Sequence, residues 1–241
     1  MTTSEARRRF PSGLTLAVIP ALALLIGLGV WQVQRLHWKE GLIAEAEAAA
    51  KQPAAPLSGV IASGDAEFRR VIVDCPGLAT APYVELQTVQ EGEVGVRLIS
   101  ACTVQNERGM GEARVYLLDR GFVAGTISAR PAVAQSAEPL RIEAVVRTPP
   151  KPNGMAPPVS GRLFFTRDPA AMAEALGVTA PVAPQTLFAL TSSNPEWRAL
   201  KPSAPPVAFE NNHLGYAATW FGLALALLGF YAALVMRRMK A

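Results

Sequence analysis

The chain has two histidines, His37 and His213, and their surroundings limit the chemistry that they can support. A catalytic zinc site typically needs three protein ligands, and neither histidine lies in a cluster of carboxylates. His213 stands in "NNHLGYAATWFG" (211–222), where polar residues run into a long apolar stretch. This pattern alone favours the interpretation that His213 is an interfacial residue that helps to start a helix, with Asn211 or Asn212 as the N-cap.

The sequence lacks the signatures of common enzymes. It contains no G-x-S-x-G, no H-E-x-x-H, no P-loop and no G-x-G-x-x-G pattern. The sequence therefore disfavours the common hydrolases and nucleotide enzymes. A membrane-anchored extracytoplasmic enzyme would need a convergent polar site, which the sequence does not reveal.

Two cysteines, Cys75 and Cys102, lie in or beside predicted strands. Their separation differs from the C-x-x-C pattern, so a redox or copper-carrying role has little support. They form either a structural disulfide, which an oxidising compartment permits, or two buried thiols. The sequence favours the thiols, because nothing in it fixes the geometry that a disulfide requires.

Two apolar segments are long enough to cross a membrane. Residues 14–36 contain one charge, Arg35, and residues 214–236 contain none; each segment has 23 residues. As a helix, such a segment extends over about 34 Å, which exceeds the roughly 30 Å of a hydrocarbon core. A cleaved signal peptide is the alternative for the first segment, but "VWQVQRLHW" follows where a small-x-small cleavage site should stand.

Basic residues at the two ends of the chain predict its orientation. Three arginines occupy 7–9 and three basic residues lie in 237–240, so the positive-inside rule places both ends in the cytoplasm. Residues 37–213 carry 16 Lys and Arg against 18 Asp and Glu. The basic balance of the chain therefore belongs to the membrane flanks and gives no reason to expect nucleic-acid binding.

Strand patterns dominate the segment between the apolar stretches. In "LRIEAVVR" (140–147), apolar residues alternate with mostly charged ones, which is the period of a half-buried strand. We predict antiparallel pairing among this strand and four similar ones at 68–74, 83–89, 94–104 and 114–123.

Helical and irregular segments surround these strands. Residues 37–51 are rich in strong helix formers, so the first helix should continue beyond the membrane and stop near Pro53. Residues 131–206 contain 14 of the 20 prolines and should include an irregular excursion at 147–161. One short helix interrupts this region, with Asp168 as its N-cap and Gly177 at its end.

These patterns together predict an α+β membrane protein in which two transmembrane helices flank one mainly antiparallel β domain. The predicted segments are a cytoplasmic N-terminus (1–13), a transmembrane helix (14–36), an extracytoplasmic domain (37–213), a second transmembrane helix (214–236) and a cytoplasmic tail (237–241).

Arg120 and Gly121 stand in "LLDRGFV" (117–123), at the predicted end of an apolar strand. Glycine permits a turn or bulge there. Arg120 could pair with an acid or face lipid headgroups, but we favour a strand end with a solvated charge.

Three blocks of the sequence resemble the family of surfeit locus protein 1, the assembly factor of cytochrome c oxidase in mitochondria and proteobacteria. "LGVWQVQRLHWKEGLI" (28–43) is similar to the family's first-helix signature, in which Gly-x-Trp-Gln-x-x-Arg leads into Trp-Lys and Leu-Ile. "NNHLGYAATWFGLALALL" (211–228) is similar to its second-helix signature, Asn-His-Leu-x-Tyr-Ala-x-Thr-Trp-Phe. "LLDRGFV" resembles its central Arg-Gly-Trp-Val element, although Phe122 replaces the usual Trp and Ala124 a frequent Pro. These departures indicate a divergent, proteobacterial member.

The resemblance implies an assembly factor that helps the large subunit of cytochrome c oxidase to acquire heme a and that is not itself an enzyme. Its expected partners are that subunit, the lipid bilayer and, as a further candidate, the heme a synthesis machinery. It also implies the cell inner membrane, with the central domain in the periplasm and both termini in the cytoplasm. The alternative is a membrane scaffold or chaperone that stabilises an oxidase subunit without binding heme.

With this resemblance, His213 becomes a candidate axial ligand of heme a iron. His37 falls at the same predicted membrane face and is a second candidate if the two helices pack side by side. Tyr216 and Trp220, one turn apart, are candidate walls for the macrocycle, with Trp38 as a further flanking aromatic. They serve equally well as membrane-interface anchors or helix contacts. We expect no separate metal site.

Overall fold

The computed structural model describes residues 11–105, 113–150, 152, 154–203 and 211–240. The chain divides into two compact units. One unit contains Met1–Glu45 and Val207–Ala241, and the other contains Ala46–Pro206.

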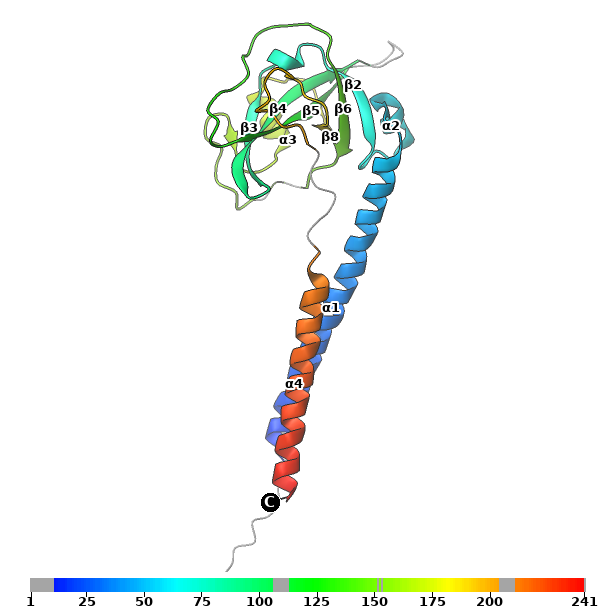
Figure 1. The fold of residues 1–241 in the computed structure, drawn as a ribbon, viewed down its shortest axis with the longest axis vertical. Coiled ribbons are helices and arrows are strands. Elements are labelled where there is room, and N and C mark those ends of the chain that lie inside the picture. Colours follow the sequence, from blue (N-terminus) through cyan, green and yellow to red (C-terminus); the bar gives the residue numbers. More distant parts are fainter. Residues whose placement is uncertain (1–10, 106–112, 151, 153, 204–210, 241) are drawn as a thin grey trace, which may run out of the picture. The chain divides into compact units, whose positions relative to one another are not determined.

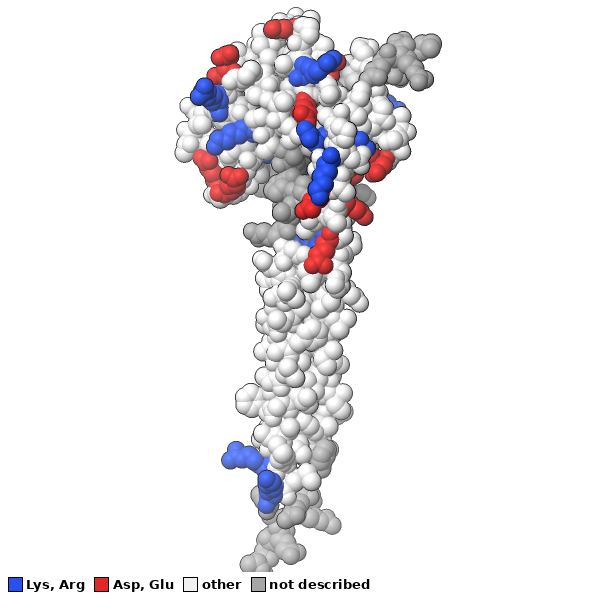
Figure 2. Space-filling model, turned by 45° about the vertical axis from the view of Figure 1, so that its right-hand side comes forward, with Lys and Arg blue, Asp and Glu red and all other residues white. Residues whose placement is uncertain are grey.

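The first unit is built from two long helices, α1 (Ser12–Lys51) and α4 (His213–Lys240), which lie side by side in Figure 1. Both are long and apolar enough to span a membrane, and only 11% and 6% of their most apolar windows are buried. Such exposure is unlike that of a helix in a soluble core. Figure 2 shows an uncharged surface along the middle of both helices. As predicted, α1 continues through strong helix formers and ends just before Pro53.

The two helices are antiparallel and meet along a seam with heptad spacing. Two side-chain contacts of 2.6 Å cross it, from Thr15 Oγ1 to Tyr231 Oη and from Gln32 Oε1 to His213 Nδ1. Alternating steps of three and four residues are typical of left-handed helix packing. The less exposed residues follow these steps at 15, 18, 22, 25, 29, 32 and 36 in α1 and at 213, 217, 220, 224, 227 and 231 in α4.

The second unit contains a mixed eight-stranded sheet in the order β1-β2-β6-β8-β5-β4-β3-β7. Its strands are β1 (Ala55–Pro56), β2 (Arg70–Asp74), β3 (Val84–Gln90), β4 (Glu93–Val104), β5 (Arg114–Ala124), β6 (Arg141–Arg147), β7 (Leu163–Phe164) and β8 (Val182–Ala189). Short helices α2 (Leu57–Ser63), η1 (Leu78–Thr80) and α3 (Pro169–Ala175) complete the unit.

The five predicted strands correspond to β2 through β6, and the predicted short helix is α3. The N-cap of α3 is confirmed, because Asp168 Oδ1 accepts hydrogen bonds of 3.1 Å from the amides of Ala170 and Ala171. The described residues of 147–161 form no helix, as expected from their prolines.

The sheet is mixed, although its longer strand pairs are mainly antiparallel. β8 lies between β6 and β5, antiparallel to the first and parallel to the second. It was not predicted, because it contains Pro184. That proline falls in the register shift between β5 and β8, where a missing backbone N–H costs no ladder bond. Two further pairs, β1 with β2 and β3 with β7, are also parallel.

β5 lies at the centre of the core and is buried on both faces from Val115 to Ala124. Tyr116 and Leu118 face a cluster with α2, β2, β6 and β8. Leu117 belongs to a second cluster with β3, β4 and α3. Covering both faces explains why β5 is a nearly continuous apolar run, interrupted only by Asp119 and Arg120.

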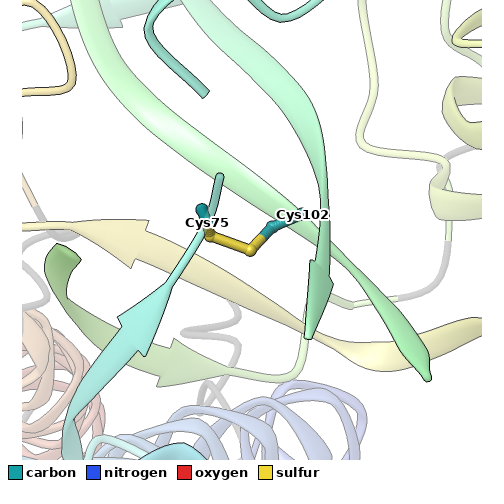
Figure 3. The surroundings of a disulfide bond; sticks show 2 residues. All are labelled: Cys75 and Cys102. Atoms are coloured by element: carbon teal, nitrogen blue, oxygen red, sulfur yellow. A yellow bond between two sulfur atoms is a disulfide. The ribbon is translucent and has the colours of Figure 1, made fainter. Parts of the chain in front are cut away.

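Cys75 and Cys102 form a disulfide (Figure 3), so the interpretation that favoured two thiols is wrong. Cys75 follows β2, and Cys102 belongs to β4. These strands are not neighbours in the sheet, yet the two Cα atoms are 5.4 Å apart, so the sheet must curl back on itself. Strand patterns in the sequence carry no information about this curl.

Loss of the disulfide should destabilise the second unit. The cysteines are 27 residues apart, and closing a loop of this length in the unfolded chain contributes on the order of 3–4 kcal/mol. We expect the Cys75→Ser, Cys102→Ser variant of the full chain in detergent to unfold at lower denaturant concentration. A reductant should lower the wild-type midpoint to that of the variant and leave the variant unchanged. Equal midpoints for wild type with and without reductant would contradict this prediction.

Candidate functional site

Gln32 and His213 form a polar contact between α1 and α4. Nδ1 of His213 lies 2.6 Å from Oε1 of Gln32. An amide oxygen only accepts hydrogen bonds, so Nδ1 of the neutral imidazole is the atom that carries the proton. The lone pair then resides on Nε2, for which the described residues provide no hydrogen-bond partner. Gln32 is buried at 8% exposure and His213 is half-buried, so the contact opens to the surface on the side of the imidazole.

One turn before Gln32, the absence of a side chain at Gly29 makes room for Phe221. A Cβ placed on Gly29 would lie 2.6 Å from Cε1 of the Phe221 ring, closer than real side chains approach. Small residues of this kind let two membrane helices come close to each other. Gly29 thus supports the approach of α4 beside the position where Gln32 reaches His213.

The described contacts do not join His37 to His213. His37 lies five residues beyond Gln32, about 140° further round the helix at roughly 100° per residue. Its Nδ1 atom is 3.3 Å from Glu40 Oε2 on the same helix, and its side chain is 72% exposed. His213 is therefore the histidine that faces the seam.

The predicted aromatic residues occupy different surroundings. Trp220 is half-buried at a seam position two turns after His213, whereas Tyr216 is 58% exposed beside the seam. Trp38 is also exposed, and the guanidinium of Arg35 lies 3.9 Å from its ring centroid. Trp220 thus shares a helix face with His213, Tyr216 borders that face, and Trp38 already has a cation partner.

The chemistry open to the helix-pair site is that of a single neutral imidazole. Among residues that the structure describes, no group of three or more His, Cys, Asp and Glu is arranged to hold a metal ion. A lone imidazole nitrogen suits a metal that already has most of its ligands, such as porphyrin iron, which takes a histidine at an axial position. Nε2 of His213, which has no hydrogen-bond partner among the described residues, fits that requirement.

The second candidate element, Arg120–Gly121, lies inside β5 and not at its end. Arg120 is completely buried, so the interpretation as a solvated charge is wrong. Burial lowers the pKa of Arg120 to about 10, which leaves the guanidinium charged at neutral pH. No carboxylate of the described residues pairs with it. Its hydrogen bonds go instead to neutral acceptors: Ser193 Oγ (2.9 Å), Ala79 O (3.0 Å), Ser100 Oγ (3.4 Å), Ala81 O (3.5 Å) and Asn194 Oδ1.

Asp119, the residue before Arg120, forms a separate ionic network on the opposite face of β5. Its Oδ2 accepts from Arg97 at 2.8 Å and from Arg167 at 2.6 Å. Arg97 also donates to the hydroxyl and the carbonyl of Ser203. The carboxylate of Asp119 thus forms ion pairs with two arginines, and Arg97 in turn binds the segment that contains Ser203.

Gly121 and Phe122 hold the same segment through the backbone. The amides of Phe122 and Lys201 donate to each other's carbonyls at 2.9 and 2.8 Å. Gly121 has a φ of +131°, and a Cβ there would lie 2.5 Å from the carbonyl oxygen of Lys201. A glycine is therefore required for both backbone conformation and clearance.

Sequence patterns did not identify the partners of Asp119 and Arg120. The available signal was an adjacent acid and base inside an otherwise apolar strand, which is costly unless both find partners. Neither the distance along the chain to Ser193 and Asn194 nor the pairing with Arg97 can be obtained from that signal. All these contacts are internal, so this element is a structural centre of the second unit.

Replacing Arg120 by leucine should destabilise the second unit by at least about 3 kcal/mol, because several buried acceptors lose their donor and each unsatisfied group costs about 1–3 kcal/mol. The measurement is denaturant unfolding of the full-length protein in detergent. Arg141→Leu is the matched control, since Arg141 pairs with Asp74 on the surface, with side chains 72% and 64% exposed, and should change unfolding little. Equal effects of the two substitutions would rule out the proposed structural role of Arg120.

Substituting Gly29 by leucine should separate α1 from α4, because the new side chain overlaps the ring of Phe221. Helix contact can be measured by the yield of cross-link that a flexible bifunctional thiol reagent forms between cysteines placed at positions 15 and 231, because the hydroxyl oxygens of Thr15 and Tyr231 are 2.6 Å apart. We expect a lower yield in Gly29→Leu and partial recovery when Phe221→Ala is added. Gly27→Leu is the control, since a Cβ there has no neighbour within 4 Å. A yield unaffected by Gly29→Leu would contradict the packing of the seam.

Comparison with known proteins relates both candidate elements to one family. The SURF1 family model matches residues 19–225. A relative, the SURF1-like protein of Drosophila melanogaster, is 28% identical over an alignment of 242 positions that covers 90% of this chain and 75% of that protein. Because the family match covers most of the chain and includes Gln32, Arg120 and His213, the chain belongs to the SURF1 family.

Proposed function

We propose that this protein assists heme a acquisition by the large subunit of cytochrome c oxidase, and that His213 ligates the heme iron during this step. The coarser part of the proposal follows from the family, because SURF1 proteins are assembly factors of cytochrome c oxidase. Heme a is the cargo in this proposal, and the protein itself carries out no turnover.

Nε2 of His213, which has no hydrogen-bond partner among the described residues, carries the proposal. Gln32 holds Nδ1, so the ring is oriented and Nδ1 cannot serve as the ligand. Iron accepts a neutral imidazole nitrogen as an axial ligand. A histidine that only started a helix would not need a buried amide to orient its ring.

The surroundings of His213 suit a flat apolar ligand. Trp220 and Tyr216 provide aromatic surface within two turns of the imidazole. The neighbouring surface of α4 is apolar, with Leu214 at 65% exposure. Such a surface can contact a macrocycle whose iron lies at Nε2, because burial of apolar area favours binding.

The proposal includes a location and an orientation. Two candidate spans together with the family make the chain a membrane protein. The basic residues in the last turn of α4, Arg237, Arg238 and Lys240, support a cytoplasmic C-terminus in the cell inner membrane. His213, at the other end of α4, would then lie at the periplasmic face, where the large oxidase subunit and the heme a synthesis machinery can reach it.

The test is the heme content and absorption spectrum of detergent-purified protein from cells that make heme a. We expect wild type to show a low-spin heme a spectrum and His213→Ala to lose most of it. His37→Ala is the matched control, because His37 is exposed and bonded to Glu40. It should retain the wild-type spectrum.

The same variants separate a carrier from a scaffold. If the protein carries heme a, His213→Ala should also lower the heme a content of the assembled large subunit. A wild-type spectrum in His213→Ala would overturn the ligand assignment. Normal oxidase assembly in that variant, with assembly lost after changes on the exposed faces of α1 and α4, would favour a scaffold that does not bind heme.

A further inference from the structure

We infer that Gln32 is a positioning residue that holds His213 in the tautomer and orientation required of a metal ligand. The inference rests on the proposed function insofar as the metal is heme iron. Gln32 lies on α1 and His213 on α4, and packing of the two helices does not by itself require a buried amide at position 32.

The tautomer follows from the contact between the two side chains. A neutral histidine carries its proton on either nitrogen, and the hydrogen bond made by one nitrogen decides which of them is free. Here the acceptor is Oε1 of Gln32, 2.6 Å from Nδ1. Nδ1 therefore donates, and Nε2 remains unprotonated.

Burial of Gln32 stabilises the tautomer of His213 that carries its proton on Nδ1. Gln32 is 8% exposed, so little water reaches its amide to replace the imidazole as its partner. A buried polar group that loses its partner is destabilised, and this favours the state in which the contact is formed. Phe221, which packs on Gly29 one turn before Gln32, keeps the helices close at this level.

An acceptor on Nδ1–H also changes the ligand strength of Nε2. Partners of this kind raise the basicity of the ligating nitrogen, and their loss typically weakens metal affinity 10–100-fold. Glutamate at position 32 would accept the same proton more strongly, because its acceptor is charged. Leucine has a similar size and accepts nothing. The two substitutions should therefore shift the reduction potential of the bound iron in opposite directions.

The first experiment needs no heme. Nitrogen-15 NMR of the full-length protein in detergent, labelled in its histidines, reports which ring nitrogen carries the proton. We expect His213 of wild type to be protonated on Nδ1 and Gln32→Leu to give a mixture of tautomers. Gln34→Leu is the matched control, since it makes the same chemical change at an exposed position two residues away. Protonation of wild-type His213 on Nε2 would overturn the inference.

The second experiment uses heme a-loaded protein and measures affinity and reduction potential. We expect Gln32→Leu to bind heme a 10–100-fold more weakly and to have a higher potential than wild type. Gln32→Glu should retain binding and have a lower potential, a split that a purely packing role does not produce. Equal potentials in both variants, or shifts of the same sign, would overturn the role of Gln32.

The two proposals fail in distinguishable ways. If His213→Ala shows a wild-type heme spectrum, His213 is not the heme ligand, whatever the tautomer of its imidazole. If that variant loses the spectrum while Gln32→Leu has wild-type heme affinity and reduction potential, His213 is the ligand but Gln32 does not position it.

Discussion

The hydrogen bond between Gln32 and His213 constrains how the two apolar helices can meet. Polar side chains at the edge of a hydrocarbon layer must satisfy each other, because lipid offers them no partner. Thr15 and Tyr231 form a similar contact further along the seam. The two contacts are 17 residues apart in α1 and 18 in α4, or roughly 26 Å at about 1.5 Å per residue. This separation is close to the thickness of a hydrocarbon core, so polar contacts fix the register near both of its edges.

The same principle organises the β domain. Successive residues of a strand point to opposite faces, so Asp119 and Arg120 place opposite charges on the two sides of β5. On one side the carboxylate joins two arginines, and on the other the guanidinium is satisfied by neutral acceptors from several loops. Both charges remain buried because each face provides its partners locally. The central family element is thus explained by the folding of the domain, without assigning it a ligand.

Features of the fold that depend on a few neighbouring residues could be predicted from the sequence, whereas features that depend on distant parts of the chain could not. Strand periodicity gave β2 to β6, and Asp168 followed by Pro169 gave the start of α3, because these patterns act within a few residues. β8 was missed because Pro184 is tolerated only at a bulge that its partner strand creates. The disulfide between Cys75 and Cys102 and the burial of Arg120 depend on the curl and coverage of the sheet. No local pattern encodes either.

The helix-pair site shows the same division between local and tertiary information. Two motifs could be identified in the sequence: "NNHLGYAATWFG", which contains His213, and the first-helix motif, which contains Gly29 and Gln32. That these motifs contact each other required the antiparallel pairing of α1 and α4. His37 lies outside this contact and is exposed, because its position on α1 is about 140° from that of Gln32 at roughly 100° per residue.

Helix association alone does not account for a histidine at position 213. Side-chain hydrogen bonds between membrane helices contribute only about 0.6 kcal/mol on average, and serine, threonine, asparagine or glutamine can all form them. Histidine adds a second nitrogen, which Gln32 leaves unprotonated and which has no hydrogen-bond partner among the described residues. Nε2 does not contribute to helix packing, but an unprotonated imidazole nitrogen is able to ligate a metal. Residues that exceed the needs of the fold are expected at functional sites, which supports the proposal that Nε2 of His213 binds a ligand.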